Sequence, residues 1–484
     1  MTSCALEEVE LKLELTGEAA GAFETANLFA VEPVISRQRS VYFDTSDHAL
    51  AQAGLSLRIR RVAGKWVQTV KRNAGAAAGL FMRQEWERRV KGDQPVLDGT
   101  TPIEALLAER IVELAPVFII QNERRLWQQD GIEIALDRGL IIAGERETLV
   151  CEIELKQKAG DFATLFAHSR RIAAVAPVRL GMLSKTQRGY RLLGPLPGAA
   201  KAEPIALTCA MTAADAFEVI AHDCIVQFRL NELLVLENQE PDALHQARVA
   251  LRRLRSAFSV YRAMLPDSES ADLGDELRWL AGALGRARDL DVLVDRAGQG
   301  SLCERLTEAR GDAYTMATDA LQSKRSRILM IDLAEWLAIG GWRLQHERGI
   351  RDLPAREVAS EALKRYHRKV RKGGRNLEDL DDAARHKVRK AVKKLHYAAD
   401  FFATLYMRKP EIRRHKRFMQ SLKGLQDQLG TLNDIANAPE LLARLGLANH
   451  PQAAALSGAK QKHRLLAAAA ASVDELIGAK RFWR

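Results

Sequence analysis

Residues 6–15 read LEEVELKLEL, and this stretch decides the fold of the N-terminal part of the chain. Charged residues stand at every second position, from Glu8 through Glu10 to Lys12, and each position between them holds Val or Leu. Because successive side chains of a β-strand point to opposite faces, the stretch predicts a strand with one charged face and one apolar face.

The same alternation recurs in short segments up to residue 193. Strands are expected at 8–15, 40–43, 55–61, 66–71, 83–89, 132–137 and 149–156, and helices at 104–114 and 162–174. Arg58 and Arg60 share one strand face, as do Glu152 and Glu154. A solvated sheet would explain one such strand, whereas the repetition also fits a closed barrel with a charged lumen. In such a lumen, carboxylates would hold hard divalent cations and basic groups would hold a polyanion.

The length and charge of the chain indicate several domains and an anionic partner. The chain has 484 residues, more than one core usually serves, so two or three domains are expected. From residue 201 onward it holds 47 Lys and Arg but only 37 Asp and Glu, so this part carries nearly all of the net charge of +11. Such an excess favours nucleic acid, anionic lipid or polyphosphate as a partner.

Cysteine usage and the lack of targeting signals indicate a reducing compartment. The five cysteines show no CxxC and no Cys/His metal spacing, so they are predicted to be free thiols. The N-terminus has no basic segment followed by an apolar run, and no stretch reaches the roughly 20 apolar residues that a membrane helix needs. The expected location is the cytoplasm.

The composition changes at residues 194–204, which read GPLPGAAKAEP. Three prolines in so short a segment predict a linker. Beyond it, Leu, Ala, Arg and Glu recur at helical spacing, so a bundle of long helices is expected, with breaks near prolines that include Pro241, Pro354, Pro410 and Pro439.

The helical part repeats itself. The motif that runs from His245 to Arg255 parallels the motif from His386 to His396. Downstream, LRWLAGALGRARD at 277–289 parallels LKGLQDQLGTLND at 422–434. Two motifs that recur in the same order indicate an internal duplication.

Each copy of the first motif predicts a cationic helix face. At about 100° per residue, the side chains of His245, Arg248, Arg252 and Arg255 span about 80° of the helix surface. A single stripe would be explained as a solvated face. Like charges on one stripe repel, however, so the pattern has a cost that some other interaction must offset. Its appearance in two copies favours a shared anion-binding surface.

The motifs of residues 1–193 resemble those of the CYTH, or triphosphate tunnel metalloenzyme, family. The family signature Glu-x-Glu-x-Lys stands here as Glu8, Glu10 and Lys12. The further matching motifs are Tyr42-Phe43-Asp44-Thr45, Leu57-Arg58-Ile59-Arg60, Thr69-Val70-Lys71, Leu136-Asp137-Arg138-Gly139, Glu152-Ile153-Glu154-Leu155 and Ser184-Lys185-x-x-Arg188-Gly189-Tyr190. The resemblance implies an eight-stranded antiparallel β-barrel whose tunnel binds triphosphate-containing substrates.

This resemblance also implies roles for single residues. One or two Mg²⁺ or Mn²⁺ ions would be held by Glu8, Glu10, Glu152 and Glu154. Phosphates would be held by the basic residues Lys12, Arg39, Arg58, Arg60, Lys71, Lys185 and Arg188. All of these except Arg39, together with Glu8 and Glu10, would take part in catalysis. Lys156 is a departure, because relatives often continue the second glutamate pair with a third Glu.

Residues 208–480 resemble the CHAD family, the conserved-histidine α-helical domain. The resemblance implies two four-helix repeats that bind inorganic polyphosphate. The residues expected to bind it are His245, Arg248, Arg252, Arg253, Arg255 and Arg278 in the first copy, and His386, Arg389, Lys393, Lys394, His396 and Lys423 in the second.

The sequence therefore predicts a multidomain α+β chain with a tunnel domain at 1–193, a linker at 194–207 and a helical domain at 208–480. The expected function is metal-dependent hydrolysis of inorganic triphosphate or short polyphosphate, with polyphosphate docked at the helical domain and with association with polyphosphate granules. Two alternatives stay open: a polyphosphate-binding or sensing protein with weak or no catalysis, and a tunnel that acts on an organic triphosphate such as thiamine triphosphate or ATP. Nucleic acid is disfavoured by the 6% aromatic content and the lack of recognition motifs.

Overall fold

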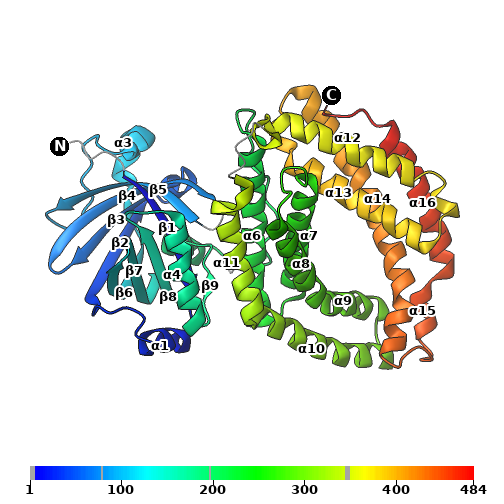
Figure 1. The fold of residues 1–484 in the computed structure, drawn as a ribbon, viewed down its shortest axis with the longest axis horizontal. Coiled ribbons are helices and arrows are strands. Elements are labelled where there is room, and N and C mark those ends of the chain that lie inside the picture. The colour runs from blue at the N-terminus through cyan, green and yellow to red at the C-terminus, as the bar shows by residue number, and fades with distance from the viewer. Residues whose placement is uncertain (1–5, 78–79, 196–197, 344–348, 484) are drawn as a thin grey trace. The chain divides into compact units, whose positions relative to one another are not determined.

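The computed structural model describes residues 6–77, 80–195, 198–343 and 349–483 (Figure 1). The chain divides into two compact units, residues 1–198 with 324–340 and residues 199–323 with 341–484. All strands longer than an isolated bridge lie in the first unit, and the second unit is helical. The predicted multidomain α+β class is confirmed. The domain limits of 1–193 and 208–480 stay predictions.

Nine antiparallel strands form the sheet of the first unit. They are β1 (Leu6–Glu14), β2 (Val34–Asp44), β3 (Leu55–Val62), β4 (Lys65–Ala77), β5 (Leu80–Val90), β6 (Ala115–Gln129), β7 (Ile132–Ala143), β8 (Arg146–Gln157) and β9 (Arg179–Leu180). Their order is β5-β4-β3-β2-β6-β7-β8-β1-β9, and β1 also pairs with β5, so β1–β8 close into a ring. In this ring β3 lies across from β8 and β4 lies across from β7, because four steps of eight separate the members of each pair.

Among the described residues of this unit, the α-helices are α1 (Gly17–Thr25), α2 (Ala49–Gln52), α3 (Pro102–Leu107), α4 (Phe162–Val175), α5 (Lys185–Leu193) and α11 (Lys324–Ile339). Helices α2 and α3 cover an outer apolar face of the sheet, where Leu57, Ile59 and Val70 are buried. The residues next to them in the strands, such as Arg58 and Arg60, therefore point into the ring, as the alternation predicts.

Helix α5 fills one end of the ring. Tyr190, Leu192 and Leu193 pack against a buried apolar cluster that includes Phe118 and Ile120 on the inner face. A Cβ at Gly189 would lie 2.4 Å from the ring of Phe118, so only glycine permits this approach. The other part of the lumen stays polar.

Helix α11 comes from the helical part of the sequence but packs against α4 and β9. Arg170 of α4 lies 2.6 Å from Asp332 in an ion pair and also pairs with Glu335, both on α11. Trp336 and Leu333 of the same helix are fully buried. Nothing in the sequence pattern sets this helix apart from its neighbours.

The second unit contains α6 (Ala213–Asn238), α7 (Pro241–Val260), α8 (Ser268–Ala283), α9 (Gly285–Ala297), α10 (Ser301–Gln322), α12 (Ala355–Gly373), α13 (Asp382–Phe401), α14 (Lys409–Arg444), α15 (Ala453–Ser457) and α16 (Ala459–Gly478). The duplicated motifs lie on α7 and α13, which contact each other, and on α8–α9 and α14. The division of this unit into two four-helix repeats stays a prediction.

The helix breaks follow the expected prolines with one exception. Pro241 and Pro410 lie in the first turns of α7 and α14, where the missing N–H costs nothing. The break expected near Pro439 is wrong, because α14 continues through it to Arg444. The reason is tertiary: Ile435, Ala438 and Leu442 on both sides of the proline are buried, so packing holds the helix together.

Candidate functional site

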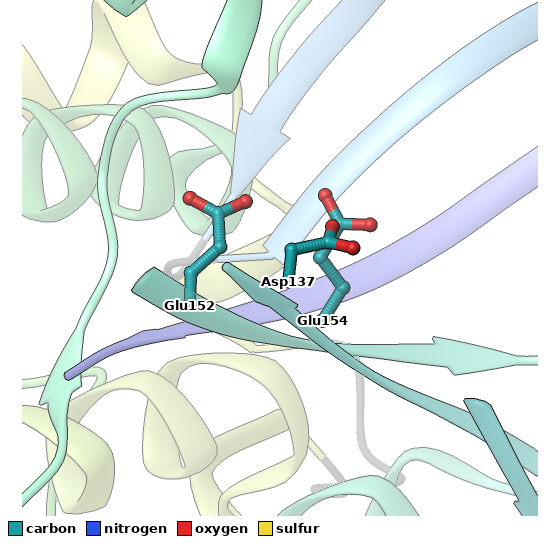
Figure 2. Close-up of side chains that lie close together, drawn as sticks. All are labelled: Asp137, Glu152 and Glu154. Carbon is teal, nitrogen blue, oxygen red and sulfur yellow. The ribbon is translucent and has the colours of Figure 1, made fainter. Parts of the chain in front are cut away.

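Three carboxylates meet inside the ring of strands. Asp137 on β7 and Glu152 and Glu154 on β8 each offer an oxygen, and these oxygens lie within 4.8 Å of one another (Figure 2). All three side chains are buried. The pairing of Asp137 with Glu152 across the two strands brings them together, and the two-residue period of β8 puts Glu154 on the same face.

Cations surround these carboxylates. The ammonium of Lys185 lies 2.6 Å from Asp137, 2.6 Å from Glu152 and 2.9 Å from Glu154. Lys12 on β1 pairs with Glu154 and lies 3.0 Å from Glu10. The charges of the buried groups are therefore balanced by direct contact, as burial requires.

A third cation comes from β6. Arg124 donates from Nε to Asp137 at 2.8 Å and from Nη2 to Glu154 at 2.6 Å. Asn122 donates to the same Asp137 at 2.7 Å. Gly139 permits this close pairing of β6 with β7, because a Cβ there would lie 1.9 Å from the carbonyl oxygen of Gln121.

Ion pairing sets the protonation states in the cluster. Burial alone would raise the pKa of the Glu154 carboxyl, but Lys12, Lys185 and Arg124 outweigh it and hold the pKa well below its usual range. The pKa of Asp137 is also lowered, by Lys185 and Arg124 against burial. Burial opposes the charge of Lys185, yet Asp137 and Glu152 raise its pKa. Asp137 and Glu154 are thus ionised and Lys185 is charged at neutral pH.

The opposite wall of the ring is basic. Arg58 and Arg60 on β3 and Lys71 on β4 line the same cavity as Glu154 and Lys185. Burial, together with Arg58 and Arg124, lowers the pKa of Arg60 to about 10. Concentrated positive charge that carboxylates do not fully balance is the environment that a phosphate chain requires.

The cavity itself is narrow, about 40 Å³. That volume holds one or a few water molecules. Its polar lining also includes the hydroxyls of Ser40 and Tyr42 on β2, Ser56 on β3 and Thr186 on α5. Burial opposes ionisation of Tyr42, but Arg58 and Thr186 stabilise the phenolate and lower its pKa.

Basic side chains also converge in the helical unit. Arg248 and Arg252 on α7 and Arg389 and Lys393 on α13 lie close enough to disfavour one another's charge. Burial, then Arg389 and Arg252, lowers the pKa of Lys393 to about 7. Burial is also the largest cause of the shift in Arg248, whose pKa falls to about 10. Two residues of each predicted stripe therefore lie near one another within this unit.

The two histidines that open the motifs have different neighbours. His386 shares a hydrogen bond of 2.9 Å between Nδ1 and the side-chain oxygen of Asn433. His245 lies instead near Arg288, and burial followed by the charges of Arg288 and Arg252 lowers its pKa to about 4. A cavity of about 530 Å³ is lined by His386, Arg389, Lys390 and Asn433, among others.

Comparison with protein families separates the strand-rich part of the chain from the helical part. Residues 6–190 match the family model of the CYTH domain, and residues 219–443 match that of the CHAD domain. The chain carries a CYTH domain followed by a CHAD domain.

The curated relatives each match part of the chain. An inorganic triphosphatase of Haemophilus influenzae is 31% identical over 207 residues, which cover 40% of this chain and 56% of that protein. An uncharacterized protein of Mycobacterium tuberculosis is 33% identical over 175 residues, which cover 33% of this chain and 34% of that protein. The chain thus spans about half or less of the length of these curated relatives.

Among solved structures, the CHAD domain from the plant Ricinus communis superposes with a TM-score of 0.50 at 28% identity. The match covers 58% of this chain and 99% of the plant domain. In the part of the chain that the structure describes, no helix is long and apolar enough to cross a membrane.

Most residues expected in the CYTH tunnel do lie in its lumen. The cavity is lined by Glu10, Lys12, Arg58, Arg60, Lys71, Glu154 and Lys185. Arg188 on α5 approaches Glu152 at 3.5 Å. The side chain of Glu8 lies outside the described residues, although β1 includes its backbone. Lys156, the departure from the family pattern, also lines the cavity and lies 3.9 Å from Glu10.

Arg39 does not lie in the lumen. Its neighbours Gln38 and Ser40 line the cavity, so Arg39 points to the outer face of β2, where it is exposed. The expectation that Arg39 holds substrate inside the tunnel therefore disagrees with the strand register.

The sequence pattern did not assign three residues of the CYTH lumen to the site. Arg124 and Asn122 lie on β6, a 15-residue strand absent from the expected set. Their alternation in the segment Asn-Glu-Arg was the available signal. Asp137 was assigned no metal role, yet it lies within the carboxylate cluster.

The CHAD residues that were expected to bind polyphosphate have different surroundings. Arg248, Arg252, Arg389 and Lys393 converge, as described above. Arg253 is 1% exposed and donates at 2.8 Å both to Asp223 and to Gln227, so it is a buried structural residue. The reason is angular: Arg253 lies about 140° around the helix from Arg248. Arg278 is exposed and pairs with Asp275 at 2.7 Å.

Other residues expected to bind polyphosphate have different charged neighbours from those of Arg248 and Lys393. Burial, then Lys369 and Arg255, lowers the pKa of Lys394, so Arg255 and Lys394 belong to a second basic cluster. The pKa of His396 is lowered mainly by burial, and Lys423 is among its charged neighbours. The polyphosphate roles of these side chains stay predictions.

Proposed function

We propose that the CYTH domain hydrolyses inorganic triphosphate or short polyphosphate with a divalent cation, and that the CHAD domain binds inorganic polyphosphate. The observation that carries the first part is the cluster of Asp137, Glu152 and Glu154 across the ring from Arg58, Arg60 and Lys71. One wall can hold cations and the other can hold phosphate oxygens, and both face one cavity.

The donor set of the carboxylate wall fits a hard divalent cation. Mg²⁺ and Mn²⁺ prefer oxygen ligands, and Asp137, Glu152 and Glu154 present carboxylate oxygens within 4.8 Å of one another. When bound, the ion would neutralise charge on the phosphate chain. Lys12 and Lys185 contact the same oxygens, so binding of a cation requires these ammonium groups to move toward the substrate phosphates.

The basic wall would orient the substrate. Arginines can donate two parallel hydrogen bonds to phosphate, and Arg58 and Arg60 lie two residues apart on one strand. Tyr42 and Ser40 add hydroxyl donors from the neighbouring strand. Packing of α5 closes one end of the ring with apolar side chains, which keeps bulk water away from the bound chain.

Four basic side chains converge in the CHAD domain, which supports a polyanion such as polyphosphate as its binding partner. They are Arg248, Arg252, Arg389 and Lys393. The relative called an inorganic triphosphatase supports the choice of substrate for the CYTH domain. A polyphosphate-binding protein with weak catalysis is the alternative, and the existing pairing of lysines with the carboxylates favours it.

The test is phosphate release from triphosphate, polyphosphates, ATP and thiamine triphosphate with Mg²⁺ or Mn²⁺. Glu154→Gln should lower the rate at least about 100-fold because a neutral amide binds hard cations poorly. Glu147→Gln, an exposed glutamate of the same strand, is the matched control and should keep the rate. A folded Glu154→Gln protein with full activity would refute the carboxylate site, and no release from any substrate would favour the binding protein.

A further inference from the structure

A second basic surface lies on the outer face of the CYTH ring. Arg37 and Arg39 on β2, Arg61 on β3 and Arg138 on β7 line a cavity of about 650 Å³. The one carboxylate in its lining is Glu123 of β6. Its lining shares Gln38 and Asn122 with the lumen cavity, whereas strand alternation turns Arg39 and Arg61 away from the inward-pointing Ser40 and Arg60.

The carboxylates near this surface already have partners. Glu123 pairs with Arg125 at 3.3 Å and lies 4.0 Å from Arg37. Glu24 accepts from Arg138 at 2.6 Å. Arg39 and Arg61 form no ion pair among the described residues, and the guanidinium of Arg61 lies 5.4 Å from the ring centre of Trp66. The charges of these two arginines are therefore not balanced by a carboxylate of the described residues, whereas Arg37 and Arg138 lie near Glu123 and Glu24.

Two of these arginines also oppose each other directly. Arg39 and Arg61 are register partners across β2 and β3. Like charges directly opposite in an antiparallel pair destabilise the sheet. An anion between them removes this cost, so the pair indicates a ligand and not a structural role.

We propose that this outer groove, formed around Arg39 and Arg61, is a second binding site for a linear inorganic polyphosphate chain. The inference deepens the proposed function, since it assigns a new site for the same class of polyanion. Three to four guanidinium groups match a chain with about one charge per phosphate. The lining contains no aromatic side chain on which a base could stack, which disfavours single-stranded nucleic acid.

Arginine footprinting on the full chain tests the site residue by residue. The protein is treated with an arginine-selective dicarbonyl reagent, with and without polyphosphate, without divalent metal so that the chain is not hydrolysed. Polyphosphate should slow modification of Arg39 and Arg61 at least about fivefold at physiological salt. Arg72, an exposed arginine of β4 outside the lining, should react equally with and without it. Equal protection of all three would overturn the site, whatever the catalytic result.

A double variant separates binding from structure. Arg39→Gln with Arg61→Gln should melt at the same or a higher temperature than the wild type without anions, since the like-charge pair is gone. Its polyphosphate binding should also depend less on salt. The slope of the logarithm of the binding constant against the logarithm of the salt concentration should become shallower by about 0.7 for each lost contact, by analogy with single-stranded nucleic acids. A lower melting temperature with an unchanged salt slope would show a structural role. Protection by an oligothymidylate of equal phosphate count, as strong as that by polyphosphate, would also overturn the proposal.

Discussion

The ammonium nitrogen of Lys185 lies 2.6 Å from Oδ2 of Asp137, which joins the first turn of α5 to the middle of β7. The contact depends on local structure at both ends. Ser184 caps α5 in a capping box with Gln187, so the helix begins at Lys185 and points it into the ring. Lys185 also forms ion pairs with Glu152 and Glu154, so one ammonium group pairs with three carboxylates.

Lys185→Gln should therefore destabilise the protein in a metal-dependent way. Removal of the shared cation leaves three buried carboxylates with fewer partners, and loss of one member of a buried pair costs about 3 kcal/mol. Added Mg²⁺ or Mn²⁺ should restore more stability to the variant than to the wild type, because the ion replaces the missing charge. Thermal melts with and without metal measure this difference. A variant that melts like the wild type and responds equally to metal would contradict the assigned role.

Arg253 and Arg252 offer a matched pair of adjacent arginines. Arg253→Leu should lower the free energy of unfolding by about 3 kcal/mol, because Asp223 and Gln227 lose a buried partner. Arg252→Leu should change stability little but weaken polyphosphate binding. Chemical denaturation and titration of labelled polyphosphate check both. If Arg253→Leu protein is fully stable and binds weakly, Arg253 contacts the ligand after all.

The two stripes should contribute unequally. Arg248→Ala with Arg252→Ala should weaken polyphosphate binding more than Arg389→Ala with Lys393→Ala, because arginine donates two hydrogen bonds to phosphate and lysine acts as a point charge. Each lost contact should also flatten the salt dependence. Arg444→Ala is the control, since that exposed side chain pairs with Glu440 and is not among the residues expected to bind polyphosphate. Titrations at two salt concentrations decide the order, and no loss in either double variant would refute the shared surface.

The lowered pKa of Lys393 predicts that polyphosphate binding depends on pH. Its pKa in the free protein is about 7, from burial and from Arg389, Arg252 and Arg248, with Asp434 opposing. A polyanion favours the charged lysine and raises the pKa in the complex. Affinity should therefore be highest below pH 7 and fall by up to tenfold per pH unit above it. Lys393→Arg should flatten this profile, while a variant that keeps the full slope would assign the effect to another group.

The sequence by itself determined the charged faces of the strands and the cationic stripes of the helices. Alternation placed Glu10 with Lys12, and Glu152 with Glu154, on one face each, since a strand has a period of two whatever its partners. The helical period did the same for Arg248 and Arg252. These are local properties, so no knowledge of distant contacts was needed.

Only the tertiary structure decided which face is the lumen and which residues meet there. Strand β2 has polar side chains on both faces near Arg39, so the sequence could not tell inside from outside, and pairing with β3 and β6 settled it. Asp137 and Arg124 meet because ring closure fixes the register of β6 and β7. Packing likewise buried Arg253, carried α14 through Pro439 and assigned α11 to the first unit. In each case a long-range contact overrides a local preference.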